Sequence, residues 1–365
     1  MGHSIREIAE AIGARAHGDV DIRVARVAEP ADARADDLAL AMRPDYAEGL
    51  SRGQARAAML WEGADWQAFG LSAAITASRP RFAMSGLSAL MDRARPQPGQ
   101  GVHPSSVVDP AAQLAPDVTV GPLAVVCAGA EVGPGGVIGA QCFVGEGARI
   151  GPDCLLHAGV RIGAGVAIGA RFVAHPGAVV GADGFSFVTP EESAVERARD
   201  TLGDASGAAQ GQAWARIHSL GGVRIGDDVE LGANSCIDRG TVRDTVVGNG
   251  VKFDNLAQIG HNVVIGNDCM ICAQVGVAGS SRIGNSVVLG GQTGVSDNLT
   301  IGDNVITGGA TKVLANVPAG RVMLGYPAMK MDNHVEVYKG LRRLPRLYRE
   351  VAQLRDAIAR LTRNG

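Results

Sequence analysis

The chain has 365 residues, of which 46% are hydrophobic, 19% charged and only 4% aromatic, and it contains 51 glycines. This composition disfavours a core of large rings and favours many tight turns between short aliphatic strands. The formal net charge of −3 argues against a general nucleic-acid binder held by phosphate contacts. No apolar run reaches 18 residues, which argues against a transmembrane helix, and the first residues lack the pattern of a secretory signal.

Residues 1–94 are expected to form a small α/β domain. Ser4 and Glu7 make a capping box ahead of an amphipathic stretch, which predicts a helix beginning after Ser4. Strand-like segments (RVARVAEP, LALAM) and further helix-like segments follow. The proline- and glycine-rich segment 95–101 is predicted to be a linker.

A six-residue repeat dominates the rest of the chain. From Val102 to Val180, thirteen of the fourteen positions spaced six apart hold a large aliphatic residue, and the exception is alanine. The repeat resumes at Ile225 and, after a skip of four residues, continues to Val313, often with glycine after the aliphatic residue. Such a unit fits a short strand and a turn, and three units close a triangular coil. Stacked coils would bury a continuous aliphatic column.

This pattern resembles the hexapeptide-repeat family, whose members form left-handed parallel β-helices and commonly assemble as trimers. The resemblance covers roughly 102–318 and implies a left-handed β-helix that assembles as a trimer. The polar insertion 183–222 is predicted to be a loop extruded from the coils, with a functional or mobile role left open. The predicted fold is therefore mainly β: a left-handed β-helix, the α/β domain, and a C-terminal helical tail over 327–365.

Three segments of the repeat carry candidate chemistry: GADGF at 181–185, IDRG at 237–240 and DNLAQIGHNVVIG at 254–266. Their order and spacing resemble the UDP-3-O-(3-hydroxyacyl)glucosamine N-acyltransferase family of lipid A biosynthesis. The resemblance implies a cytoplasmic homotrimer that takes an acyl group from acyl carrier protein, which bears it on 4′-phosphopantetheine. The acceptor is the 2-amino group of a UDP-3-O-acylglucosamine, and no metal or separate cofactor is expected.

By that resemblance His261 is the catalytic base, because an imidazole can accept the proton of an attacking amine near neutral pH. Asp254 is expected to orient His261 or stabilise its charge, and Asn255 and Gln258 to position the substrate. Gly279, one coil beyond His261, is expected to offer a backbone N–H to the oxyanion. Without the surrounding motif, a lone histidine in such a wall would be interpreted as a simple surface residue.

Two segments depart from the family pattern. Where many members carry a second histidine, this chain has Asn298, which could still donate a hydrogen bond to substrate. The family's uridine motif presents an aromatic residue, an asparagine and a tyrosine, and the matching positions are Leu40, Arg43 and Tyr46. Tyr46 is expected to stack on the base and Arg43 to hold a phosphate or the uracil carbonyls.

Other histidines and cysteines receive structural interpretations. His157 and His175 lie eighteen residues apart and are expected to stack on successive coils, which is favoured over a metal pair because no third ligand is evident. The lone CxxC formed by Cys269 and Cys272 is interpreted as two small wall residues. The six scattered cysteines predict reduced thiols rather than a disulfide framework.

The tail combines basic residues with an apolar stripe at helical spacing, at Leu347, Val351, Leu354, Ile358 and Leu361, and Pro345 is expected to break or kink it. A helix that associates within the trimer and a docking surface for acidic acyl carrier protein are both compatible with this pattern.

Two other functions stay open as alternatives, and a third is disfavoured. One is another hexapeptide acyltransferase acting on a different sugar nucleotide, and a second is a purely structural β-helix. A γ-type carbonic anhydrase would need three metal-binding histidines in a close pattern, which the eight histidines do not supply. The sequence leaves the acyl chain length, and an ester or amide at the sugar 3-position, undetermined.

Overall fold

The computed structural model describes residues 2–92, 99–201, 206–207, 211–325 and 328–363. They form two compact units, Met1–Pro96 and Gln97–Gly365. The boundary between the units lies within the predicted linker. Positions 95–98 of that linker, and Pro327 at the predicted start of the tail, lie outside the described residues.

The first unit is an α/β domain, as the sequence predicts. Its elements are β1 (His3–Ser4), α1 (Ile5–Ala11), β2 (Arg15–Gly18), β3 (Arg23–Val24), β4 (Arg26–Ala28), β5 (Asp37–Ala41), α2 (Pro44–Ala47), the 3₁₀ helix η1 (Glu48–Ser51), β6 (Ala57–Trp61), β7 (Ala73–Ala77) and α3 (Pro80–Met91). The predicted capping box of α1 is confirmed: Ser4 Oγ accepts the Glu7 N–H at 3.1 Å, and the Glu7 carboxylate accepts the Ser4 N–H at 2.8 Å.

A five-stranded sheet in the order β2–β7–β6–β5–β4 divides the first unit's core in two. Side chains alternate along β5, so Leu38 and Leu40 pack in the cluster with α1 and α3, whereas Ala39 and Ala41 face the cluster with η1. Small residues on the second side let η1 approach the sheet closely.

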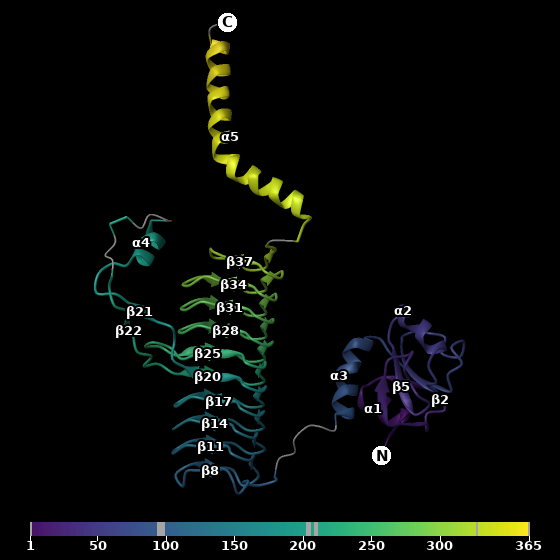
Figure 1. The fold of residues 1–365 in the computed structure, drawn as a ribbon. Helices are drawn as coiled ribbons and strands as arrows, with labels where there is room; N and C mark the ends of the chain where they lie inside the picture. The colour runs from purple at the N-terminus through teal and green to yellow at the C-terminus, as the bar shows by residue number, and fades with distance from the viewer. Residues whose placement is uncertain (1, 93–98, 202–205, 208–210, 326–327, 364–365) are drawn as a thin grey trace. The chain divides into compact units, whose positions relative to one another are not determined.

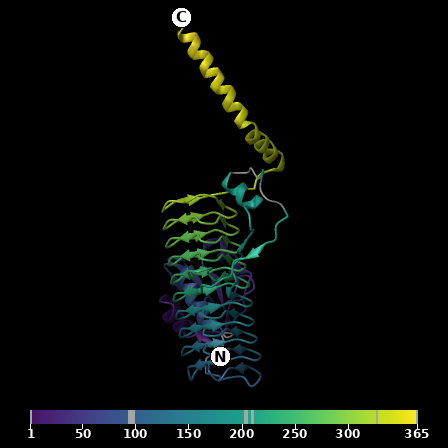
Figure 2. The ribbon, with the colours of Figure 1, turned by 90° about the vertical axis from the view of Figure 1, so that its left-hand side faces the viewer.

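The second unit is a left-handed parallel β-helix of three sheets, drawn in Figures 1 and 2. Face 1 holds β10 (Thr119–Val120), β13 (Val137–Ile138), β16 (Leu155–Leu156), β19 (Val173–Ala174), β24 (Glu230–Leu231), β27 (Lys252–Phe253), β30 (Met270–Ile271), β33 (Val288–Leu289), β36 (Ile306–Thr307) and β38 (Val322–Met323). Face 2 holds β8 (Val107–Val108), β11 (Val125–Val126), β14 (Phe143–Val144), β17 (Arg161–Ile162), β20 (Val179–Ala182), β25 (Cys236–Asp238), β28 (Gln258–Ile259), β31 (Gly276–Val277), β34 (Gly294–Val295) and β37 (Lys312–Val313). Face 3 holds β9 (Gln113–Leu114), β12 (Glu131–Val132), β15 (Arg149–Ile150), β18 (Ala167–Ile168), β23 (Val223–Ile225), β26 (Thr245–Val247), β29 (Val264–Ile265), β32 (Arg282–Ile283) and β35 (Thr300–Ile301).

The predicted repeat positions form the core of the coils. Ile138, Leu156 and Ile162 are fully buried in one continuous aliphatic cluster, and strands eighteen residues apart pair in register, as at Val120↔Ile138. Val102 is the exception, with 52% of its surface exposed. It forms only an isolated bridge to Val120 at the open end of the helix, where no earlier coil covers it.

The insertion leaves the coils after β20 and returns at β23, so the predicted extruded loop is present (Figure 1). It contains β21 (Phe187–Val188) paired antiparallel with β22 (Ala215–Arg216), and α4 (Ala194–Asp200). The tail forms α5 (Met331–Arg363), which runs without a break through Pro345 and changes direction part-way along (Figure 1). The apolar stripe predicted on it is exposed in this single chain. Within the described ranges, no helix combines the length and apolarity needed to cross a membrane.

Candidate active site

His261 occupies the turn between β28 and β29, half-exposed and outside the aliphatic interior. Two glycines hold its ring closely. A Cβ built on Gly184, at the root of the extruded loop, would lie 2.7 Å from the His261 Cβ, and one built on Gly279, in the next coil, would lie 2.7 Å from Nε2. Real side chains do not tolerate such contacts, so each glycine is needed for the ring to sit where it does.

The other edge of the ring faces polar groups. His261 Nδ1 lies 2.9 Å from Asn262 Oδ1 and 3.4 Å from Thr241 Oγ1. Asn262 is 7% exposed, and its side chain in turn donates to the carbonyl of Arg243 at 2.7 Å. The ring is therefore fixed from three sides, with the Nε2 edge beside Gly279.

A buried carboxylate in the preceding coil interacts electrostatically with this histidine. Asp238, at the end of β25, is 8% exposed, receives a hydrogen bond from the Gln258 side chain, and accepts the Cys236 thiol at 3.6 Å. Burial raises the pKa of Asp238, while Gln258, Cys236 and the charge of His261 act to lower it. Burial and the neighbouring Asp238 raise the pKa of the Cys236 thiol to about 12, so this thiol stays protonated.

Asp238 is not among the residues predicted from the sequence, although it belongs to the IDRG motif. A signal was present: it follows the inward Ile237 where the coils before and after carry Gly181 and Gly260. The signal is weak, because Asp109 and Asp254 hold the same position after other inward residues.

The structure places Asp254 and Asn255 at a different corner of the coil, between β27 and β28. The Asp254 carboxylate accepts the Asn255 N–H at 2.7 Å, and Asn255 Oδ1 accepts the Ala233 N–H at 2.7 Å. Both side chains thus bond within their own turn or to the preceding coil. Asp238 is the carboxylate whose pKa the charge of His261 acts to lower, and the predicted catalytic role of Asp254 stays a prediction.

Gln258 lies on β28 of face 2, and Gly279 and Asn298 lie at the same corner of the coil as His261, in the turns after β31 and β34. Gln258 extends from the exposed side of β28 and contacts Asp238, as noted above. Within the described part of the chain, the Gly279 N–H meets no hydrogen-bond acceptor, whereas its carbonyl accepts the Asn298 N–H at 3.1 Å. Asn298 is exposed, and its side chain donates to Asp297 at 3.2 Å. Their substrate contacts stay predictions.

A groove of about 800 Å³ runs along face 2 from Gln258 to Lys312. Consecutive strands present Gln258, Gly276, Gly294 and Lys312 at paired positions, so the two glycines leave a trough above the sheet. A Cβ on Gly276 would meet nothing within 4 Å, whereas one on Gly294 would lie 3.3 Å from the Lys312 Cδ. Lys312 therefore lies over the far end of the trough.

Comparison with known proteins agrees with this architecture. Residues 244–279, which include His261, match the family model described as "Bacterial transferase hexapeptide (six repeats)". A curated UDP-3-O-acylglucosamine N-acyltransferase from Ruegeria pomeroyi is 65% identical over 364 residues, covering 99% of both chains. The chain belongs to the UDP-3-O-acylglucosamine N-acyltransferase family, a family of acyltransferases.

A second family member, from Paracoccus denitrificans, is 60% identical over 367 residues and covers all of this chain and 99% of its own. Among solved structures, an Arabidopsis UDP-N-acetylglucosamine acyltransferase matches with 20% identity and a TM-score of 0.51, covering 62% of this chain and 71% of its own. That likeness supports the fold.

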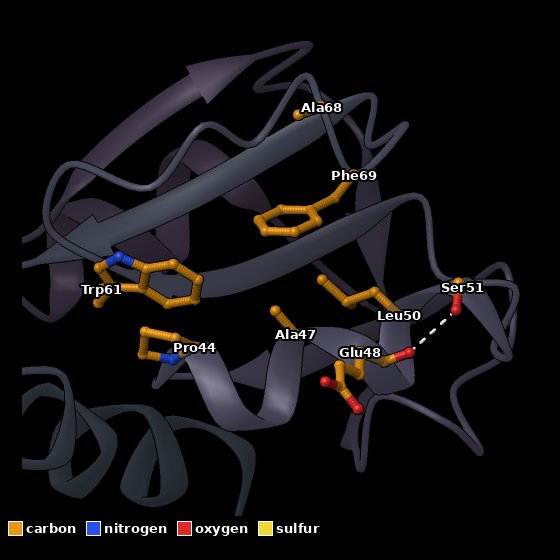
Figure 3. A pocket seen from close by; sticks show the side chains of 8 residues that line it. All are labelled: Pro44, Ala47, Glu48, Leu50, Ser51, Trp61, Ala68 and Phe69. Carbon is orange, nitrogen blue, oxygen red and sulfur yellow. Dashed lines mark hydrogen bonds between the residues drawn. The ribbon is translucent and has the colours of Figure 1, made fainter.

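The N-terminal unit of this family member contains a separate pocket of about 460 Å³, shown in Figure 3. It is lined by Pro44, Ala47, Glu48, Leu50, Ser51, Trp61, Ala68 and Phe69. Neither Arg43 nor Tyr46 lines it: Arg43 bonds to Asp45 at 3.0 Å, and Tyr46 is 51% exposed. Leu40 packs on the opposite side of the sheet. The structure thus does not gather the three uridine-motif positions at this pocket, and their nucleotide contacts stay predictions.

The predicted histidine stack is confirmed. The rings of His157 and His175 lie 5.1 Å apart and 7° from parallel, and His175 Nε2 lies 2.9 Å from Glu230. Burial, and then the neighbouring His175, lower the pKa of His157. Among the described residues, no three histidine, cysteine or acidic side chains gather to hold a metal ion. All six cysteines are free.

Proposed function

We propose that this chain transfers a (3-hydroxy)acyl group from the phosphopantetheine thioester of acyl carrier protein to the 2-amino group of a UDP-3-O-acylglucosamine, with His261 as the general base. The acceptor is proposed from the name shared by the curated relatives that are 65% and 60% identical to this chain. The observation that carries the role of His261 is its ring, held between Gly184 and Gly279 with the Nε2 edge outside the coil.

The reaction needs one proton to move twice. As the sugar amine attacks the thioester carbonyl and the C–N bond forms, His261 Nε2 takes the amine proton. The oxyanion of the tetrahedral intermediate accepts the Gly279 N–H, which is otherwise without an acceptor in the described chain. The C–S bond then breaks, and the imidazolium returns the proton to the leaving sulfur, giving an amide and a thiol. Asp238 stabilises the imidazolium through the electrostatic interaction that joins the two groups.

The groove on face 2 supports an acyl substrate. It begins at Gln258, which contacts Asp238, and its glycine-lined trough offers an apolar sheet surface without side chains. Replacing Gly276 with leucine fills open space rather than packed atoms. We expect Gly276→Leu to lower turnover of long acyl thioesters about tenfold while sparing short ones, measured by competition between acyl carrier protein thioesters.

The composition of the three faces supports a homotrimer. Most outward positions of face 1 are apolar, namely Val137, Leu155, Val173, Met270, Val288, Ile306 and Val322, and the polar ones are Thr119, Glu230 and Lys252. Most corresponding positions of face 3 are polar, namely Gln113, Glu131, Arg149, Arg224, Arg282 and Thr300, and the apolar ones are Ala167, Val246 and Val264. A ring of three copies would cover face 1 of each and leave face 3 in water.

The C-terminal helix supports docking of an acidic carrier protein. Along α5 the chain presents exposed basic residues, namely Lys339, Arg342, Arg343, Arg346, Arg349, Arg355 and Arg360. Such a surface attracts an acidic partner and speeds its association. Six free cysteines fit the reducing cytoplasm, which we propose as the location.

Substitution of His261 tests the proposal. We expect His261→Ala to lower kcat about 10³-fold with acyl carrier protein thioester and UDP-3-O-acylglucosamine, since a positioned general base contributes on that order. Product formation is followed by mass spectrometry, with a second sugar nucleotide as the competing acceptor. The exposed His103→Ala serves as control. Turnover by His261→Ala equal to the parent, or a preference for the second acceptor, would overturn the proposal.

A further inference from the structure

We infer that Asn262 is a positioning residue that fixes the proton of His261 on Nδ1 and so keeps Nε2 free to act as a base. The inference concerns the site of the proposed function and rests on it for its consequence in catalysis. The protonation state of the ring nitrogens does not depend on the proposed function, because it follows from hydrogen bonds that are present without substrate.

The orientation of the Asn262 amide is determined by its neighbours. Its Nδ2 donates to the Arg243 carbonyl at 2.7 Å, and a carbonyl can only accept. On its other side, Oδ1 accepts the backbone N–H of Thr241 at 3.2 Å, and a backbone N–H can only donate. Reversing the amide would set oxygen against oxygen and N–H against N–H, so the carbonyl end faces the histidine.

This orientation determines the form of the imidazole. Asn262 Oδ1 lies 2.9 Å from His261 Nδ1 and has no proton to give, so the hydrogen bond requires a proton on Nδ1. In the neutral ring the lone pair then belongs to Nε2, the nitrogen beside Gly279. The opposite form would bring two lone pairs together at this distance.

The extruded loop also holds the segment that contacts Asn262 Oδ1. The Thr241 carbonyl accepts the Leu220 N–H at 2.8 Å, and Arg239 Nε donates to the Gly221 carbonyl at 2.7 Å. The returning end of the loop therefore holds the segment that binds Oδ1. The Asn262 N–H itself donates to Thr245 Oγ1 at 2.8 Å. These bonds give the insertion a structural task beside the histidine.

The backbone of Asn262 allows a controlled substitution. Its φ of 62° lies in the left-handed region, where glycine and aspartate are also tolerated. Asn262→Gly removes the amide without adding backbone strain, and Asn262→Asp keeps the shape but adds a charge. Asn304 is a matched control, since it has a φ of 57° in an exposed turn and takes no part in the site.

The decisive measurement is ¹⁵N NMR of histidine-labelled full-length protein, with His261→Gln to assign the signal. The parent is expected to show Nδ1 protonated and Nε2 unprotonated above the histidine pKa, and Asn262→Gly to show a mixture. An Nε2-protonated ring in the parent, or an unchanged pattern in Asn262→Gly, would overturn the inference. These results do not depend on turnover, so they stand apart from the outcome for His261→Ala.

Kinetics supply the second readout. We expect Asn262→Gly to lower kcat about tenfold to a hundredfold with KM changed less than twofold, because the wrong form of the ring is inactive as a base. Asn262→Asp should move the acidic limb of the kcat profile upward by about one pH unit, since an adjacent carboxylate favours the imidazolium. Asn304→Gly should match the parent in both. An unmoved acidic limb in Asn262→Asp, with normal folding, would also count against the inference.

Discussion

Among the residues that the structure describes, each unit buries one aspartate, and the environments of these two carboxylates shift their pKa values in opposite directions. In the N-terminal unit Asp37 has no exposed surface, and both its oxygens bond to the Arg26 guanidinium, at 2.6 and 2.9 Å. It also accepts the Arg34 N–H at 2.8 Å. The hydrogen bonds from Arg26 hold the pKa of Asp37 below its ordinary value, in spite of burial.

In the β-helix Asp238 is nearly as buried, but its partners are a thiol and a side-chain amide, and the charge that faces it is that of His261. Burial therefore dominates and raises its pKa. Asp37 has a permanent cation, whereas Asp238 gains one only when His261 takes up a proton. Asp37 is therefore a carboxylate that stabilises the fold. Asp238, in contrast, has its most favourable partner, protonated His261, only during the proposed reaction.

The largest effect on stability is expected at Asp37. Asp37→Ala should lower the unfolding free energy of the N-terminal unit by about 2–3 kcal/mol, because it removes charged hydrogen bonds and leaves the Arg34 N–H without this acceptor. The half-exposed Arg26 can return to water, which limits the loss. Urea unfolding followed by tryptophan fluorescence measures it, since Trp61 and Trp66 lie in this unit. Asp45→Ala, in an exposed pair with Arg43, is the control and should change stability by less than about 1 kcal/mol.

Substitution of Asp238 tests the comparison most directly, because it should lower activity without lowering stability. Asp238→Asn removes a buried charge, so the unfolding free energy at pH 7 should not fall, and should rise by up to about 1 kcal/mol. Turnover should fall about tenfold, because the imidazolium loses its negative neighbour. Circular dichroism melts and steady-state kinetics provide the two numbers. A variant that is destabilised yet fully active would show that Asp238 serves the fold, as Asp37 does.

The coils could be predicted from the sequence because inward-pointing residues recur at a fixed six-residue spacing. Positions such as Ile138 and Leu156 are six-residue multiples apart, and burying them determines strand, register and stacking together. The position of His261 follows from the same count, since any residue two after an inward aliphatic of face 2 falls in that turn. The six-residue spacing does not show where the stack of coils ends, as the exposed Val102 at its open end illustrates.

Most of the groups around His261 could not be obtained in that way; Gly279 is the exception, because it lies one coil beyond His261. Thr241 and Arg243 lie in the four-residue skip, and Gly184 lies in the extruded loop, so regular spacing places none of them. Asp238, the carboxylate that interacts electrostatically with His261, lies one coil earlier, and the repeat alone does not single it out. The pocket beside Trp61 was missed for a related reason: it forms between irregular segments of the N-terminal unit, where no periodicity applies.

The smallest expected effect, and the most specific, is the pH dependence of stability. Asp37 has a lowered pKa, so its contribution is present above the unfolded value of about 3.9 and is lost as the pH falls through its folded pKa. Asp238 has a raised pKa, so its contribution is full below about 3.9 and is lost as the pH rises through its folded pKa. The unfolding free energy of Asp238→Asn relative to the parent should thus increase as the pH rises above 4. The deficit of Asp37→Ala should instead shrink as the pH falls below 4. Equilibrium unfolding from pH 3 to pH 7 measures both curves, and slopes of the same sign would mean that the two carboxylates are held alike.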